Sequence, residues 1–222
     1  MPFDPVIHHR RSIRLRGYDY SQAGAYFVTV CVQGHRCLFG DVVNGEMRLN
    51  DAGRMAQTVW ERLPDRFPSV ELDTFVVMPN HIHGIILLVD ASRGRGESCI
   101  RPGVNDENAN DHMDGHMDGH MDDHMGDHKD RPCGTLAGTI GRVIQAFKSI
   151  LTHEYVMGVR QHGWPLFAGR LWQRNYYEHV IRDAESLDRI REYILTNPFR
   201  WTLDRENPRR TGKDGFDLYE MS

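Results

Sequence analysis

The residues best suited to chemistry in this sequence are two histidines that stand one residue apart, His81 and His83. They open the apolar run 81–89, which follows the β-rich run 75–77 after a Met-Pro-Asn break. Side chains alternate between the faces of a strand, so both imidazoles would project from one face while Ile82 packs on the other. Two neighbouring imidazoles form half of a site for a divalent metal. The alternative is a polar pair on a solvated face; the apolar flanks favour the metal, because buried imidazoles need partners.

A second pair of polar residues, Tyr193 and Asn197, lies at the end of a predicted helix. Residues four apart share a helix face, and an apolar stripe borders this one. A half-buried tyrosine with its hydroxyl in water is the simplest interpretation. The competing one is a metal held by His81, His83 and the Asn197 oxygen, which polarises a phosphoryl oxygen while the Tyr193 oxygen attacks in line. Such a reaction would leave a phosphotyrosine link to a DNA 5′ end and a free 3′-hydroxyl.

The elements that position these residues follow from hydrophobic periodicity and from turn and capping signals. The run 171–181 is expected to be a strand or an extended segment that leads into a turn. We expect strands over 25–32, 70–77 and 81–89, a small hairpin at Asn44-Gly45, and helices over 51–67, 136–155 and 183–197. This order predicts an α+β fold, a ferredoxin-like antiparallel sheet with helices mainly on one face.

The domain organisation follows from length and from shifts in composition. With 222 residues, 40% of them hydrophobic and 26% charged, the chain is expected to form a single domain over 1–222. A basic N-terminal arm over 1–17, a His/Asp-rich insertion at about 91–133 and a polar, mobile tail at about 202–222 are set apart from it. His-Met-Asp repeats within the insertion favour a disordered loop, with a metal-binding tract as the alternative.

The formal net charge of −4 hides an asymmetry, because most of the compensating acid lies in 106–130. Without that segment the body of the chain is basic, which indicates a polyanionic partner. No apolar run approaches the roughly 18 residues of a membrane span and none resembles a signal peptide, so we expect a cytoplasmic location and no membrane partner. The four cysteines lack zinc-type spacing and are expected to be free thiols.

Two blocks of the sequence also resemble a known family. The block 78–84, Met-Pro-Asn-His-Ile-His-Gly, is similar to the histidine-hydrophobe-histidine (HUH) signature of single-tyrosine transposases. The block 171–182, followed by Tyr-Ile-Leu-Thr-Asn-Pro at 193–198, resembles the REP-associated tyrosine transposases. The resemblance covers roughly 11–201 apart from the histidine repeat. It implies a ferredoxin-like HUH domain, one Mg²⁺ or Mn²⁺ ion, and cleavage of single-stranded DNA folded as hairpins from repetitive extragenic palindromes.

Carried over residue by residue, the resemblance assigns His81 and His83 to the metal, Tyr193 to the nucleophile, and Asn197 to the position of a third polar ligand. Tyr176 and Tyr177 are rival nucleophiles in the sequence. Strand alternation would send them to opposite faces, so at most one could approach the metal.

DNA contacts are expected from basic and aromatic side chains. The N-terminal arginines resemble a family arm that contacts the hairpin, and they would neutralise phosphates in any sequence context. Core packing of Trp172 is an open alternative to base stacking, and the exposed helix residues are equally at home in water. The predicted DNA-binding residues are Arg10, Arg11, Arg14, Arg16, Arg142, Lys148, Trp172 and Arg174.

The leading hypothesis is therefore a metal-dependent transposase that cleaves and rejoins single-stranded DNA, acts as a monomer or homodimer and is associated with the nucleoid. A second hypothesis is a domesticated protein that binds DNA hairpins without cutting them. A third is a metal-storage or metal-sensing protein built on the histidine repeat.

Overall fold

The structure, a computed structural model, describes residues 22–89 and 139–212. Its centre is a four-stranded sheet with the strand order β4-β5-β1-β6, in which every neighbouring pair is antiparallel. A two-stranded hairpin, β2-β3, stands beside it. The strands are β1 (Gly24–Cys31), β2 (Gly40–Val43), β3 (Glu46–Leu49), β4 (Val70–Val77), β5 (His81–Leu88) and β6 (Tyr177–Ile181), and the helices are the 3₁₀ turn η1 (Gln33–His35), α1 (Asp51–Glu61), α2 (Leu63–Arg66), α3 (Ile140–His162) and α4 (Ala184–Thr196).

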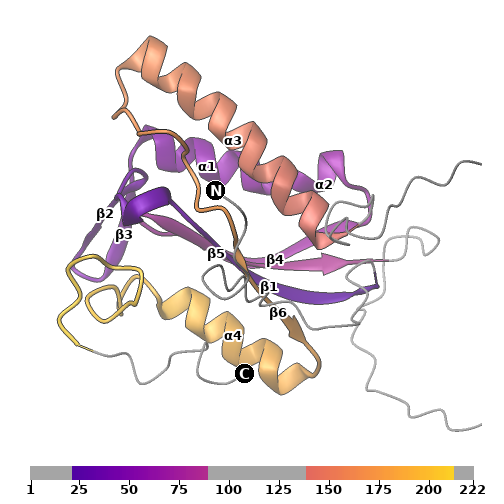
Figure 1. Cartoon of the computed structure of the whole chain (residues 1–222). Helices are drawn as coiled ribbons and strands as arrows, with labels where there is room; N and C mark the ends of the chain where they lie inside the picture. Colours follow the sequence, from indigo (N-terminus) through magenta and orange to yellow (C-terminus); the bar gives the residue numbers. More distant parts are fainter. Residues whose placement is uncertain (1–21, 90–138, 213–222) are drawn as a thin grey trace, which may run out of the picture.

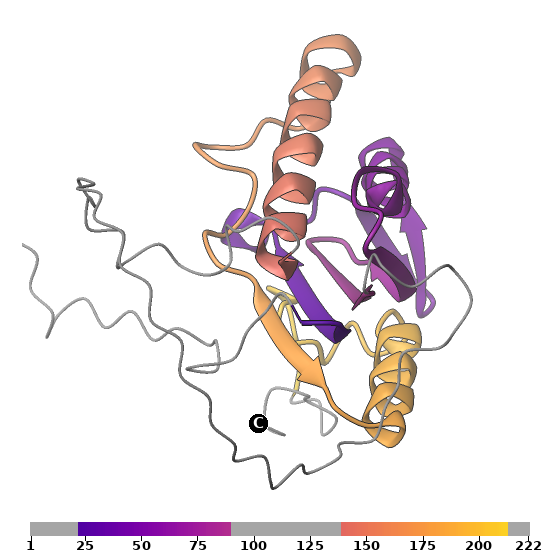
Figure 2. The same cartoon turned by 90° about the vertical axis from the view of Figure 1, so that its right-hand side faces the viewer.

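The helices lie on both faces of the sheet, with the larger layer on one of them. Helices α1 and α3 cover one face and α4 lies against the other (Figure 1). The view from the side shows β6 leading directly into α4, so the last strand and the last helix are joined by a short turn (Figure 2). The order β1-α1-β4-β5-α3-β6 with two helices on one face is the ferredoxin-like arrangement, and the predicted fold class is confirmed.

Local signals in the sequence explain several of these elements. Asn50 caps α1 by accepting a hydrogen bond from the Gly53 N–H at 2.9 Å. Asp183 caps α4 through the Ser186 N–H at 2.7 Å. Asn44 and Gly45 have φ of 55° and 79°, the left-handed pair that a two-residue hairpin requires. These elements therefore form where the sequence predicts them.

Two helices differ in length from the prediction. The helix expected over 51–67 breaks after Glu61 into α1 and α2, because Pro64 has no N–H to donate to the preceding turn. The helix expected to end near Tyr155 continues to His162 and stops at Gly163, whose φ of 67° forms a left-handed C-cap.

Helix α4 is fixed to the edge of the sheet by an ion pair. A bulge between Leu72 and Phe75 interrupts the β4-β5 pairing, and Asp73 lies within it. The Arg191 guanidinium of α4 donates to both Asp73 oxygens, at 3.0 Å and 2.5 Å. The guanidinium holds the pKa of Asp73 at about 2, below its usual value, so the carboxylate stays charged. The sequence shows neither the bulge nor this pairing.

Several predictions concern residues that the structure does not describe. The arm with Arg10, Arg11, Arg14 and Arg16, the histidine repeat and the end of the tail from residue 213 on lie outside the described ranges. Cys31 and Cys37 are free thiols, and the other two cysteines are not described. Across 22–89 and 139–212, no helix combines the length and the apolar character needed to span a bilayer.

Candidate metal centre and its nucleophile

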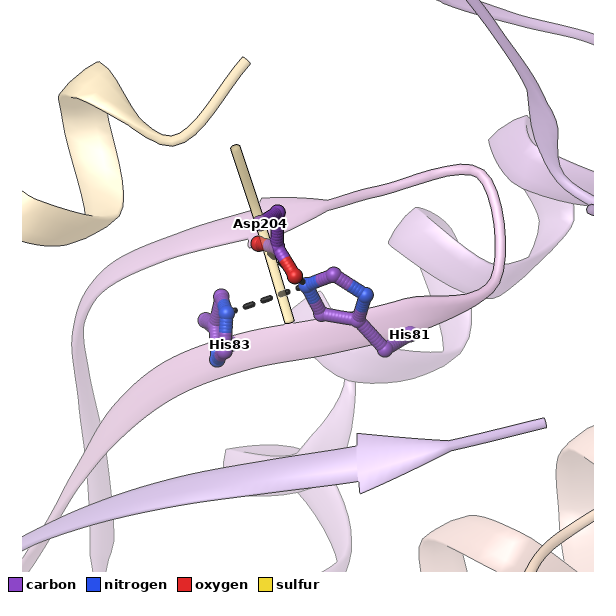
Figure 3. A group of neighbouring side chains, drawn as sticks. All are labelled: His81, His83 and Asp204. Atoms are coloured by element: carbon purple, nitrogen blue, oxygen red, sulfur yellow. Dashed lines mark hydrogen bonds and ion pairs between the residues drawn. The ribbon is translucent and has the colours of Figure 1, made fainter. Parts of the chain in front are cut away.

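Strand β5 places His81 and His83 on the α4 face of the sheet. Ile82 packs in the core beneath α1 and α3, while the flanking imidazoles point the other way, as strand alternation predicts. Both imidazoles are fully buried. Their Nε2 atoms lie 3.0 Å apart, so the two rings meet edge to edge in the interior (Figure 3).

A carboxylate from the end of the chain completes the group. Asp204 is buried, and its Oδ2 lies 3.8 Å from the His81 Nε2. Figure 3 shows the carboxylate over the gap between the two rings. Within the described residues, His81, His83 and Asp204 form a group whose ligand atoms all lie within 4.8 Å of one another. Two imidazoles and one carboxylate are a donor set that binds divalent transition metals.

The first part of the predicted polar tail is folded into turns. Residues 198–211 form successive turns held by backbone hydrogen bonds, among them Asp204 N–H to Arg200 O at 3.2 Å and Thr211 N–H to Thr202 O at 2.9 Å. Asp204, Glu206 and Asn207 are buried there. A polar, basic sequence gives no periodic signal for such turns, which is why Asp204 could not be identified as part of the site.

Burial controls the charge of the imidazoles. Loss of hydration lowers the pKa of His81, although the nearby carboxylates of Asp204 and Glu206 raise it in part. Burial, followed by repulsion from His81, lowers the pKa of His83 well below its ordinary value. Both rings are therefore neutral near pH 7, and a neutral imidazole is the form that binds a metal.

Hydrogen bonds fix the outer edges of both rings. The His81 Nδ1 lies 2.8 Å from the Asn80 Oδ1, and the His83 Nδ1 lies 2.8 Å from the Thr29 Oγ1. With their outer nitrogens engaged, the two Nε2 atoms face the interior. Partners at the outer nitrogen orient metal-ligating histidines in this way.

Helix α4 brings Tyr193 to the same place. Its side chain is buried against Phe27, and its hydroxyl lies 3.5 Å from the His83 Nε2. The Tyr193 and His83 rings meet edge to face, with centroids 5.2 Å apart. The structure thus brings together the residues that the sequence predicted as nucleophile and metal ligand, which are 110 residues apart in the chain.

Asn197 lies one turn beyond Tyr193, at the C-terminal end of α4. Its amide nitrogen donates to the Asp204 Oδ2 at 3.0 Å, the same oxygen that faces His81. Its buried Oδ1 has no hydrogen-bond partner among the described residues. A buried amide oxygen without a partner is costly, by about 1–3 kcal/mol, unless a cation or another donor satisfies it.

The rival tyrosines lie on opposite sides of β6, as alternation predicts. Tyr176 packs against the core beneath α3, with the Lys148 ammonium 5.6 Å from its ring centroid. Tyr177 packs edge to face on Phe27, with centroids 6.1 Å apart, and so shares the α4 face with the imidazoles. Tyr177 is the remaining competitor of Tyr193.

Two predicted DNA-binding residues are engaged inside the protein. Trp172 is buried between Phe39 and Phe147 and donates its indole N–H to the Lys148 carbonyl at 3.2 Å, which is the core packing that was the alternative to base stacking. The Lys148 ammonium donates to the carbonyls of Gln173 and Asn175 at 3.0 Å and 3.1 Å. Burial lowers the pKa of Lys148 to about 8. Both residues tie the segment before β6 to α3, a role that the polar-face argument from sequence did not detect for Lys148.

Arg142 and Arg174 are exposed, on α3 and on the segment before β6. Arg142 donates to the Gln145 side chain at 3.1 Å. Their part in DNA binding stays a prediction, as does that of the four arginines of the N-terminal arm.

The fold and the buried His-His-Asp group define an α+β protein with a ferredoxin-like sheet and a candidate metal centre. The structure of a REP-associated tyrosine transposase bound to a REP hairpin superimposes on this chain with a TM-score of 0.50 and 17% sequence identity, covering 86% of this chain and 74% of that one. At that identity the likeness establishes the fold.

An uncharacterized protein of Haemophilus influenzae (strain ATCC 51907 / DSM 11121 / KW20 / Rd) is 36% identical over 206 residues, which are 91% of this chain and 96% of that protein. No protein-family model matches the sequence. The chain belongs to the family of the Haemophilus influenzae protein.

Proposed function

We propose that this protein is a metal-dependent enzyme that cleaves and rejoins single-stranded DNA at hairpin sites through a covalent link between Tyr193 and a 5′ phosphate. The observation that carries the proposal is the 3.5 Å separation between the Tyr193 hydroxyl and the His83 Nε2, inside a buried group that includes His81 and Asp204. The fold shared with a transposase solved on a REP hairpin supports DNA hairpins as the substrate class.

The residues present fit one divalent ion. His81 and His83 would supply two imidazole nitrogens and Asp204 a carboxylate oxygen, and the unpartnered Asn197 Oδ1 is within the same polar cluster. Mg²⁺ and Mn²⁺ are the proposed ions. When bound, such an ion supplies Lewis-acid stabilisation of the charge on a phosphoryl oxygen.

The reaction assigned to the chain is transesterification. The Tyr193 oxygen attacks the scissile phosphorus, and the bond from phosphorus to the 3′ oxygen breaks. The phenolic proton passes through solvent to the departing 3′ oxygen, which becomes the free 3′-hydroxyl. The aromatic contacts with His83 and Phe27 hold the phenol at the imidazole pair before the strand arrives. Because the phosphotyrosine link keeps the energy of the phosphodiester bond, attack by a 3′-hydroxyl rejoins the strand without ATP.

Burial restricts what can reach this centre. His81 and His83 are fully buried, and Trp201 and Asp204 lie over them, with 6.0 Å between the His81 and Trp201 ring centroids. A phosphate therefore reaches the site only when part of this cover moves. A single strand requires a smaller opening than a duplex, which supports single-stranded DNA as the form that is cut.

The test incubates the purified full-length protein with 5′- and 3′-labelled single-stranded hairpin DNA and Mn²⁺ or Mg²⁺. We expect a covalent adduct between protein and DNA that resists denaturation. It should contain the 3′-labelled fragment and not the 5′-labelled one, and it should be absent in Tyr193→Phe and in His81→Ala. Tyr177→Phe, which removes a hydroxyl from the same face, is the matched control and should form the adduct. An adduct that persists in Tyr193→Phe and is lost in Tyr177→Phe or Tyr176→Phe would overturn the assignment.

The burial of the site favours a second candidate, a hairpin-binding protein that does not cut. His81, His83 and Asp204 are all buried, and such a protein would not need a phosphate to reach them. In that case the same experiment gives a shifted band in native gels and no adduct with either ion.

A further inference from the structure

Asn80, the residue before the histidine pair, has an orientation that its partners determine. Its side-chain nitrogen donates to the carbonyl oxygens of His35, at 3.0 Å, and Glu206, at 2.7 Å. Carbonyl oxygens only accept, so the amide cannot be turned around. Its Oδ1 must therefore face the His81 ring, 2.8 Å from Nδ1.

This orientation fixes the hydrogen on the His81 ring. An amide oxygen accepts but cannot donate, so the His81 Nδ1 must carry the hydrogen. A neutral imidazole has one N–H, which leaves the His81 Nε2 as a bare lone pair that faces His83 and Asp204. That is the form a ligand needs.

The His83 ring can take either of two arrangements. When both rings bind one ion, both Nε2 atoms present lone pairs to it. When no ion lies between them, two Nε2 atoms 3.0 Å apart need one hydrogen, and since His81 has none there, the His83 Nε2 must donate it. The His83 Nδ1 is then bare and accepts from the Thr29 hydroxyl at 2.8 Å. His83 cannot bind an ion in this form, because its inward nitrogen is protonated.

Binding an ion at both Nε2 atoms therefore requires a change at His83 alone. The Nε2 proton is released to water and a proton from water is taken up at Nδ1, with no net change in protons. Thr29 permits both states because a hydroxyl can donate in one and accept in the other. Valine has the same shape and can do neither.

We propose that Asn80 and Thr29 are positioning residues of the metal centre: Asn80 locks His81 in its metal-binding tautomer, and Thr29 lets His83 exchange between a closed form and a metal-binding form. The Asn80 side chain also donates to the carbonyl of Glu206, two residues from Asp204, and so links that segment to the residue before β5. One side chain thus orients the first ligand and anchors the segment that carries the third. The inference rests on the proposed metal site.

The direct test is the imidazole tautomers, measured by long-range ¹H–¹⁵N correlation spectra of the full-length protein with ¹⁵N-labelled histidine at pH 8. Without metal, we expect His81 protonated at Nδ1 and His83 at Nε2. With Zn²⁺ added as a diamagnetic probe, His83 should change to Nδ1–H and His81 should not. A metal-free His81 protonated at Nε2, or a His83 that keeps its Nε2 proton at saturating Zn²⁺, would overturn the proposal.

Variants supply a second readout, the dissociation constant for Mn²⁺ measured by electron paramagnetic resonance. Thr29→Val should weaken binding about 10-fold, because a metal-bound imidazole donates more strongly than a free one accepts, and Thr29→Ser should restore it. Tyr26→Phe removes another buried hydroxyl from β1 and should leave binding unchanged. Equal affinity in Thr29→Val and Thr29→Ser would contradict the role of Thr29.

The two proposals fail in different ways. Normal tautomers and Mn²⁺ binding without a DNA adduct would contradict strand cleavage and leave this inference intact. An adduct formed by a protein whose tautomers do not change on metal binding would contradict only this inference.

Discussion

The two faces of the central sheet differ in what they bury. The face under α1 and α3 is largely apolar, with large side chains such as Trp60, Phe147 and Tyr155 fully buried. Glu178, which lies opposite Val28 in the β1-β6 pairing, is a buried polar residue on this face. The face under α4 has a smaller apolar cluster around Phe27 and Ile190. The rest of that face is polar: two imidazoles, a carboxylate, an amide and a threonine hydroxyl, all buried.

Strand β5 has apolar side chains that stabilise the fold on one face and the polar side chains of the candidate site on the other. Buried polar groups contribute little net stability even when they are paired, whereas each large apolar side chain contributes several kcal/mol. Strand β5 contributes Ile82 and Ile86 to the first face and His81 and His83 to the second. The face under α1 and α3 can therefore hold the strand rigid while the other face carries the polar side chains of the candidate site.

The largest effect on stability is expected from a substitution on the face of the sheet under α1 and α3. Phe147 is fully buried between Trp60 and Trp172, with ring centroids at 5.2 Å and 5.9 Å. Phe147→Ala should lower the free energy of unfolding by about 3–5 kcal/mol, because it removes a large side chain and leaves a cavity. Urea denaturation measures the loss.

Leu195→Ala is the control, since that side chain is 69% exposed on α4 and should cost little. The comparison would fail if Phe147→Ala abolished Mn²⁺ binding while leaving stability within 1 kcal/mol of the native protein.

An intermediate effect on stability, with a large effect on metal binding, is expected from Asp204→Asn. The amide keeps an oxygen for the Glu206 N–H, and Asn197 can rotate its own amide to preserve their contact. Stability should change by about 1 kcal/mol or less. The affinity for Mn²⁺ should fall at least about 10-fold, because an anionic ligand is lost. Calorimetry measures both quantities, and unchanged affinity would remove Asp204 from the site.

The smallest effect is expected from the ion pair that holds α4 on the sheet. Arg191 is 39% exposed and Asp73 13% exposed, so Arg191→Met should cost only about 0.5 kcal/mol in spite of the close contact. The folded-state pKa of Asp73 is lowered to about 2, so this contribution is present above about pH 4 and is lost as the pH falls toward 2.

Urea denaturation at pH 6 and pH 2.5 should therefore show a difference between Arg191→Met and the native protein that shrinks in acid. Arg189→Met, on the exposed side of the same helix, should show none. A difference that does not depend on pH would mean that the ion pair is not its source.

The sequence was sufficient for features that depend on neighbours along the chain. Alternation in β5 predicted that His81 and His83 share a face, and the Asn44-Gly45 turn and the Asn50 and Asp183 caps were found where the residues indicated. The resemblance to tyrosine transposases added the expectation that Tyr193 belongs with the histidines. The structure brings these side chains within reach of one another.

The tertiary structure alone decided the features that depend on contacts between distant segments. Asp204 joins the imidazoles because turns after α4 fold back over β5. The Lys148 ammonium is engaged by carbonyls of the segment before β6, and Trp172 of that segment donates to the Lys148 carbonyl. A periodic pattern records which face of an element is apolar, but not which polar side chain a non-periodic turn will bring to it. The sequence thus determined which face of β5 carries the two imidazoles, and the packing of the turns after α4 brought the carboxylate of Asp204 to them.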